Sequence, residues 1–149
     1  MRDLNRRELI AGSAALLGVA GFGSAPAAAA NNAPELIKAF TGGKPTTAGK
    51  VKLDLPEIAE NGNTVPMTVS VESPMTEASY VSEVLVVGDG NPNGGMVTFH
   101  FTPASGVAEA NTRIRLAQTQ DITAVAKMSD GTFFTAVKQV KVTIGGCGG

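Results

Sequence analysis

The sequence predicts an all-β, immunoglobulin-like sandwich of about seven strands, preceded by a short helix. Of the 149 residues, 43% are hydrophobic and 17% are charged, which is ordinary for a globular domain. Short runs after residue 50 alternate between apolar and polar side chains, as half-buried strands do. Eighteen glycines and a 5% aromatic content indicate many turns and a light, aliphatic core. A single cysteine excludes the disulfide of antibody domains, and a small closed barrel is the competing fold.

Residues 1–30 have the features of an export signal, which we expect to be removed from the folded protein. Arg6 and Arg7 precede a mildly apolar stretch, and residues 28–30 are the small alanines that signal peptidase requires. The pattern resembles a twin-arginine signal, with ordinary Sec export as the alternative. The stretch is too diluted by glycine to span a bilayer. We therefore expect a mature form without a membrane anchor, exported after folding with a partner acquired in the cytoplasm.

The mature chain is predicted to consist of one domain, residues 31–144, and an arm, residues 145–149. Its first segment, residues 31–40, predicts a helix, because Pro34 suits a first turn and the apolar residues fall on one face. From there the period changes to two. The predicted strands are residues 51–55, 65–71, 80–87, 97–101, 112–116, 122–128 and 132–144.

Turn residues separate these strands. Asn61-Gly62-Asn63 follows the first strand, and the glycine-rich segment 88–95 is predicted to be a hairpin connection. This segment lacks the Lys-Ser/Thr ending of a phosphate-binding loop, so it predicts no nucleotide site. Asp130-Gly131 is a two-residue hairpin signal.

Few side chains of the predicted domain suggest chemistry. One histidine and one cysteine are too few for most metal sites, so we expect no metal and no cofactor, and a metal-binding sandwich of the superoxide-reductase kind is excluded. His100 is predicted to be a surface or interface residue. Arg113 and Arg115 share a strand face that could contact an anion or a partner, but a solvated face is favoured. The net charge of −1, without a basic run, excludes nucleic-acid binding.

The residue that carries chemistry is Cys147, flanked by Gly145, Gly146, Gly148 and Gly149. Glycine has the widest backbone freedom, so this segment is predicted to be a flexible arm that exposes the sulfur. A lone thiol in an oxidising compartment tends to react or to pair. The arm brings no base and no oxyanion hole, so catalysis must come from other proteins. The sequence therefore predicts a carrier rather than an enzyme, with covalent attachment at Cys147.

The sequence allows three other interpretations of the arm. The protein could be a non-catalytic exported β-sandwich module, linked to its neighbours through an intermolecular disulfide of Cys147. The cysteine could be an incidental thiol, although such cysteines are usually buried. The final Gly148-Gly149 could be adenylated as in ubiquitin-like sulfur carriers, but that chemistry needs ATP, and export argues against it.

The twin-arginine-like signal, the small β-sandwich and the sequence Gly145-Gly146-Cys147-Gly148-Gly149 together resemble the SoxY family. These proteins are the sulfur carriers of the periplasmic thiosulfate-oxidising Sox system. The resemblance covers the whole chain, including the strand pattern of residues 65–71 and the lead into the arm, residues 140–144.

The resemblance implies a mechanism and a set of partners. A SoxZ-like subunit would bind in the cytoplasm and be exported with this chain as a heterodimer. A SoxAX-like cytochrome would join thiosulfate to Cys147, and a SoxB-like hydrolase would release sulfate. A SoxCD-like dehydrogenase would oxidise the sulfur that remains, before a second hydrolysis frees the thiol.

Overall fold

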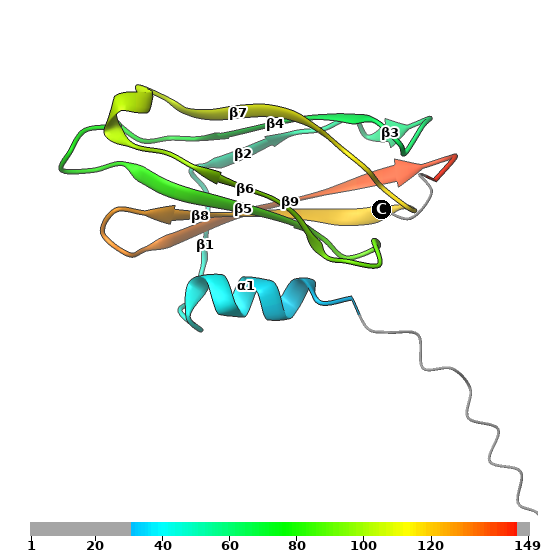
Figure 1. The fold of residues 1–149 in the computed structure, drawn as a ribbon, viewed down its shortest axis with the longest axis horizontal. Coiled ribbons are helices and arrows are strands. Elements are labelled where there is room, and N and C mark those ends of the chain that lie inside the picture. The colour runs from blue at the N-terminus through cyan, green and yellow to red at the C-terminus, as the bar shows by residue number, and fades with distance from the viewer. Residues whose placement is uncertain (1–30, 146–149) are drawn as a thin grey trace, which may run out of the picture.

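The computed structural model describes residues 31–145, in which one helix is followed by nine strands in two facing sheets (Figure 1). The elements are α1 (Ala33–Thr41), β1 (Thr47–Ala48), β2 (Val51–Asp54), β3 (Ile58–Ala59), β4 (Val65–Val71), β5 (Val81–Gly88), β6 (Gly95–His100), a 3₁₀ turn η1 (Pro103–Ser105), β7 (Ala108–Ile114), β8 (Gln120–Met128) and β9 (Phe133–Val142). Within this part of the chain, no helix is both long and apolar enough to cross a membrane.

The larger sheet has six strands in the order β1-β9-β8-β5-β6, with β3 also paired to β9. The smaller sheet has three strands in the order β2-β4-β7. Neighbouring long strands run antiparallel, whereas β1 and β3 pair with β9 in parallel. The predicted immunoglobulin-like sandwich is therefore confirmed, with β1 and β3 added to the seven predicted strands. Each of these two has only two residues, too few to show a period in the sequence.

The core lies between the two sheets and follows the alternation of the sequence. In β4, Val65, Met67, Val69 and Val71 are buried, and the residues between them face outward. Because the side chains of a strand point alternately to opposite faces, this strand buries one face and exposes the other. Strand β5 is apolar on both faces, since it lies inside the larger sheet and is covered on both sides.

Helix α1 covers the outer face of the larger sheet, on the side away from β2, β4 and β7 (Figure 1). Leu36, Ile37 and Phe40 pack against Leu85 and Val87 of β5. As expected, its proline lies in the first turn, and a glycine with a φ of 62° follows its last turn in the left-handed conformation that glycine adopts at low cost.

Both predicted hairpins are confirmed. Strands β8 and β9 pair on either side of Asp130-Gly131, where Gly131 has a φ of 82°. Strands β5 and β6 pair across the glycine-rich segment 88–95. Strand β7 begins at Ala108, four residues before the predicted start. Its first residues alternate alanine with polar side chains, and alanine is too small to mark a buried face in the sequence pattern.

Candidate functional site: the root of the cysteine arm

The predicted site falls partly outside the described residues. Cys147, Gly146, Gly148 and Gly149 lie beyond residue 145, as the predicted export signal lies before residue 31. Gly145 is the last described residue. The structure therefore shows the root from which the predicted arm leaves the sandwich.

Hydrogen bonds hold the root to the end of β3 and to the segment that follows it. The Thr143 N–H donates to the carbonyl of Ala59 at 3.1 Å, and the Thr143 hydroxyl donates to the carbonyl of Glu60 at 3.2 Å. The next carbonyl, that of Ile144, accepts from the N–H of Gly62 at 2.8 Å. The chain is therefore held in place for two residues past the end of β9.

Gly145 lies against the segment that follows β7. A Cβ atom added at Gly145 would collide with the carbonyl oxygen of Ala117. Gly145 is not among the residues of positive φ, so the backbone conformation itself does not require glycine there. Glycine is needed because only a residue without a side chain allows this close approach.

A buried amide cluster fixes the position of the segment that Gly145 contacts. Asn91, which is 5% exposed, donates from Nδ2 to the carbonyl of Arg115 at 2.8 Å. Its Oδ1 accepts from the Ala117 N–H at 2.9 Å and from Gln120 Nε2 at 2.8 Å. Gln120, also buried, accepts at Oε1 from the N–H of Gly90 at 3.1 Å. Buried amides are stable only when paired, and this cluster ties the 88–95 loop to the root.

The first described residue joins the same cluster. Asn31 donates from Nδ2 to the carbonyls of Gly88 and Asn91, at 3.0 and 2.5 Å. Its Oδ1 accepts from the Ala33 N–H at 2.8 Å at the start of α1. The start of the folded domain and the root of the arm therefore meet at one end of the sandwich. The side chains of this cluster are neutral amides, which can position the chain but cannot act as a general base at neutral pH.

The other residues singled out by the sequence lie on the surface. His100 is exposed, with Nδ1 at 3.2 Å from Glu83 Oε1, and Lys127 Nζ lies 3.7 Å from the other oxygen of this carboxylate. Arg113 and Arg115 are exposed too, and Arg113 Nη1 donates to a threonine hydroxyl at 3.4 Å. The expected surface positions are therefore confirmed, and the structure does not gather these residues into a catalytic constellation. Within residues 31–145, no cluster of three or more His, Cys, Asp or Glu side chains could hold a metal ion.

Sequence reasoning missed Asn91 and Gln120. In the sequence, Asn91 stands among the turn residues of segment 88–95, and Gln120 precedes the predicted strand 122–128. A polar residue in a turn is usually solvated, and only the meeting of loops 88–95 and 115–120 buries these two amides.

Comparison with known proteins gives a consistent result. The family model described as "Sulfur oxidation protein SoxY" matches residues 37–147. The solved structure of the sulfur carrier protein SoxY from Chlorobium limicola f thiosulfatophilum is 29% identical, with a TM-score of 0.63 over 74% of this chain and 96% of that one. None of the curated proteins matches this chain significantly.

Superoxide reductases share the fold at lower identity. The enzyme (neelaredoxin) from Ignicoccus hospitalis is 18% identical, with a TM-score of 0.57 over 63% of this chain and 80% of that one. A putative superoxide reductase from Thermotoga maritima is 16% identical, with a TM-score of 0.53 over 69% and 89% of the two chains. Likeness at this level of identity concerns the fold alone.

Proposed function

Because the chain belongs to the SoxY family and has a carrier role in sulfur oxidation, we propose that it carries thiosulfate-derived sulfur covalently on Cys147. The observation that carries this proposal is the extent of the family match, which runs through the domain and the arm to residue 147. The root geometry supports it, since the chain is held up to Gly145 and the cysteine follows two residues later.

The proposed loading step is an oxidation. The Cys147 thiol and thiosulfate form a sulfur–sulfur bond, which gives a cysteine S-thiosulfonate and releases one proton and two electrons. A SoxAX-like c-type cytochrome accepts the electrons. The thiolate is the reactive form of cysteine, so deprotonation of Cys147 precedes bond formation. This chain supplies the cysteine sulfur to which thiosulfate is joined, and the partner cytochrome supplies the oxidant and the catalytic groups.

The remaining proposed steps regenerate the thiol. A SoxB-like hydrolase adds water to the terminal sulfonate, which leaves as sulfate, and a persulfide remains on Cys147. A SoxCD-like dehydrogenase then oxidises the outer sulfur to a sulfonate, taking six electrons and the oxygens of three water molecules. A second hydrolysis releases sulfate and restores the thiol. An arm of glycines suits this sequence because it carries no side chain that would clash with successive active sites.

The proposal includes the organisation and location of the protein. Residues 1–30 act as a twin-arginine signal, residues 31–144 form the carrier domain, and residues 145–149 form the arm. The mature protein works in the periplasm as a heterodimer with a SoxZ-like subunit, which enters with it because the twin-arginine route transports folded proteins. The amide cluster supports the boundary at residue 31, since Asn31 already belongs to the folded domain.

A reconstitution experiment tests the covalent step. The chain is incubated with thiosulfate, a SoxAX-like cytochrome and the SoxZ-like subunit, and its intact mass is measured before and after reduction. We expect a reducible thiosulfonate adduct on the wild type and none on Cys147→Ser. Thr143→Ser is the matched control, because it changes one side chain near the root and keeps the hydroxyl that binds Glu60. An adduct of equal yield on Cys147→Ser would refute the proposal. A persistent disulfide dimer without any adduct would favour the assembly-module alternative.

A further inference from the structure

A groove beside the root of the arm is lined by two arginines. It lies between the start of β6 and the end of β7 and has a volume of about 380 Å³. Arg113 and Arg115 line it together with Asn91, Asn93 and Met96, and none of the described residues that line it is an aspartate or a glutamate. The groove therefore combines two positive charges with amide donors, a composition that suits an anion.

Neither arginine has an acidic partner in the part of the chain that the structure describes. The ion pairs found there both belong to Glu83. Both arginine side chains are exposed, and Arg113 donates to the hydroxyl of Thr64 at 3.4 Å. A guanidinium has five N–H donors and stays charged in proteins, so most of these donors remain available to a ligand.

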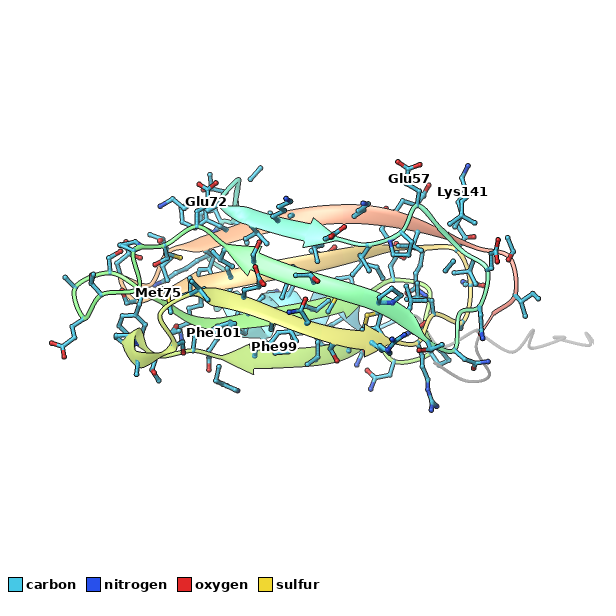
Figure 2. All side chains as sticks on the ribbon, turned by 90° about the horizontal axis from the view of Figure 1, so that it is seen from above. Glu57, Glu72, Met75, Phe99, Phe101 and Lys141 are labelled. Atoms are coloured by element: carbon cyan, nitrogen blue, oxygen red, sulfur yellow. The ribbon has the colours of Figure 1, made fainter. Side chains whose placement is uncertain are left out.

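The groove opens on the β6 side of the sandwich. Figure 2 shows Phe99 of β6 along one long side of the molecule and Glu57 and Lys141 along the other. The latter two residues are neighbours, since the Lys141 N–H donates to the Glu57 carbonyl at 2.9 Å. Neither of them lines the groove, so the Glu57 carboxylate does not neutralise it from within.

Asn91 connects the groove to the root of the arm. It lines the groove, and its Oδ1 accepts from the N–H of Ala117, whose carbonyl oxygen meets Gly145. Its Nδ2 donates to the carbonyl of Arg115 at 2.8 Å. The arginine and the contact point of the arm are thus two residues apart in one segment, and a single buried side chain fixes both.

The arm is long enough for Cys147 to reach the groove. Cys147 follows Gly145 by two residues, which span at most about 7 Å. Arg115 precedes Ala117 by the same number of residues, so its backbone lies within about 7 Å of the segment that Gly145 contacts. The cysteine and arginine side chains extend the reach from both ends. The glycines of the arm carry no side chain that would prevent the chain from turning back.

We propose that this groove is an anion site for the sulfonate end of the loaded arm. The inference rests on the proposed function, in which Cys147 carries thiosulfate-derived sulfur. Loading replaces a neutral thiol with an S-thiosulfonate, whose three terminal oxygens share a negative charge. Arg113 and Arg115 donate charge-assisted hydrogen bonds to these oxygens. The unloaded thiol offers neither charge nor oxygens, so the groove distinguishes the loaded arm from the unloaded one.

NMR spectroscopy of the mature chain tests the proposal without a partner enzyme. Tetrathionate loads the cysteine chemically: the Cys147 thiolate attacks one of its two inner sulfurs, the S-thiosulfonate forms, and thiosulfate leaves with the electron pair of the broken sulfur–sulfur bond. Iodoacetamide gives a neutral adduct for comparison. We expect the guanidinium signals of both arginines and the side-chain amide signal of Asn93 to shift in the loaded chain only. The shifts should shrink as the salt concentration rises.

This loading requires only a thiol. Failure of the cytochrome to load Cys147 would therefore refute the proposed function and leave the groove experiment intact. Conversely, an empty groove would leave the reconstitution result unaffected.

The test variant is Arg113→Gln/Arg115→Gln. Both side chains are exposed, and Asn91 binds the backbone carbonyl of residue 115, so the fold should be retained. Removal of the two charges should lower the equilibrium constant for docking at least about fivefold, as followed by the Asn93 amide shift.

The matched control, Lys38→Gln/Lys44→Gln, removes the same charge at the opposite end of the sandwich. Lys38 lies in the last turn of α1, and the Lys44 ammonium lies near Gly131 of the β8–β9 hairpin. We expect this control to dock like the wild type. Equal shifts in the loaded and the iodoacetamide-treated chains would overturn the proposal and assign the groove to the carboxylate of Gly149. An absence of shifts in the loaded chain, or unchanged docking in the arginine variant, would also overturn it.

Discussion

Asn91 is the residue whose loss should most disturb the root of the arm. Its side chain is buried and bonds to three groups of the 115–120 segment. In Asn91→Ala these three groups remain, but the side chain to which all of them bond is gone. The Ala117 N–H and the Arg115 carbonyl lose their bonds to Asn91, whereas the Gln120 amide keeps a bond to the carbonyl of Gln118 at 3.1 Å.

The expected cost follows from those two stranded groups. A buried donor or acceptor left without a partner costs about 1–3 kcal/mol, and partial access of water to the half-buried Ala117 reduces this value. We therefore expect Asn91→Ala to lower the free energy of unfolding by about 2–4 kcal/mol.

Urea unfolding followed by far-UV circular dichroism measures this difference. The slope of the unfolding free energy against urea concentration should be the same in the variant as in the wild type. The control is Asn93→Ala in the same loop, since Asn93 is exposed and accepts a single hydrogen bond from Gly95 at 3.1 Å. We expect the control to lose no more than about 1 kcal/mol. Equal losses in the two variants, or a loss below 1 kcal/mol in Asn91→Ala, would refute the assignment of the cluster as the support of the root.

Two further predictions concern the root and the β8–β9 hairpin. Gly145→Ala should cost about 1–3 kcal/mol in unfolding experiments and slow the loading of Cys147, because the added Cβ displaces the root; unchanged stability and loading would contradict the close packing seen here. Hydrogen bonds from the Thr132 side chain and then from its N–H hold the pKa of the exposed Asp130 below its ordinary value of 3.8. The stabilisation from this lowered pKa is present above pH 3.8 and is lost as the pH falls through the folded-state pKa. The substitution Thr132→Val should move the pKa of Asp130 back up towards 3.8, which an NMR titration measures. An unchanged titration midpoint would show that the Thr132 hydroxyl is not the cause of the lowered pKa.

Much of the fold could be predicted from local pattern. The period of two in residues 65–71 reports that one face of a strand is buried, and β4 has this range in the structure. The Asp130-Gly131 hairpin follows from the backbone conformation that glycine permits. Pro34 and the glycines after Thr41 set the limits of α1 within two residues of the predicted helix. In each case the cause lies within a few residues of the effect.

The site was predictable only at the cysteine. Cys147 was identified from its glycine neighbours and its isolation as the single thiol. The support of its arm was not, since Asn91 lies in the 88–95 loop and Gln120 begins β8, and the two bond only after folding. Gly145 shows the same limit: the sequence pattern assigns it to a flexible arm, whereas its contact with Ala117 places it at the root.

By itself, the sequence determined the strand pattern, the helix, the hairpins and the residue proposed to carry sulfur, because these depend on local periodicity and on residue chemistry. Only the tertiary structure decided how nine strands divide between two sheets, how β1 and β3 cover one edge, and which edge stays free. Strand pairing and amide burial depend on which distant segments meet. Strand β4 lies at the centre of its sheet and β6 at an edge, yet both alternate apolar with polar side chains, so alternation alone does not distinguish them.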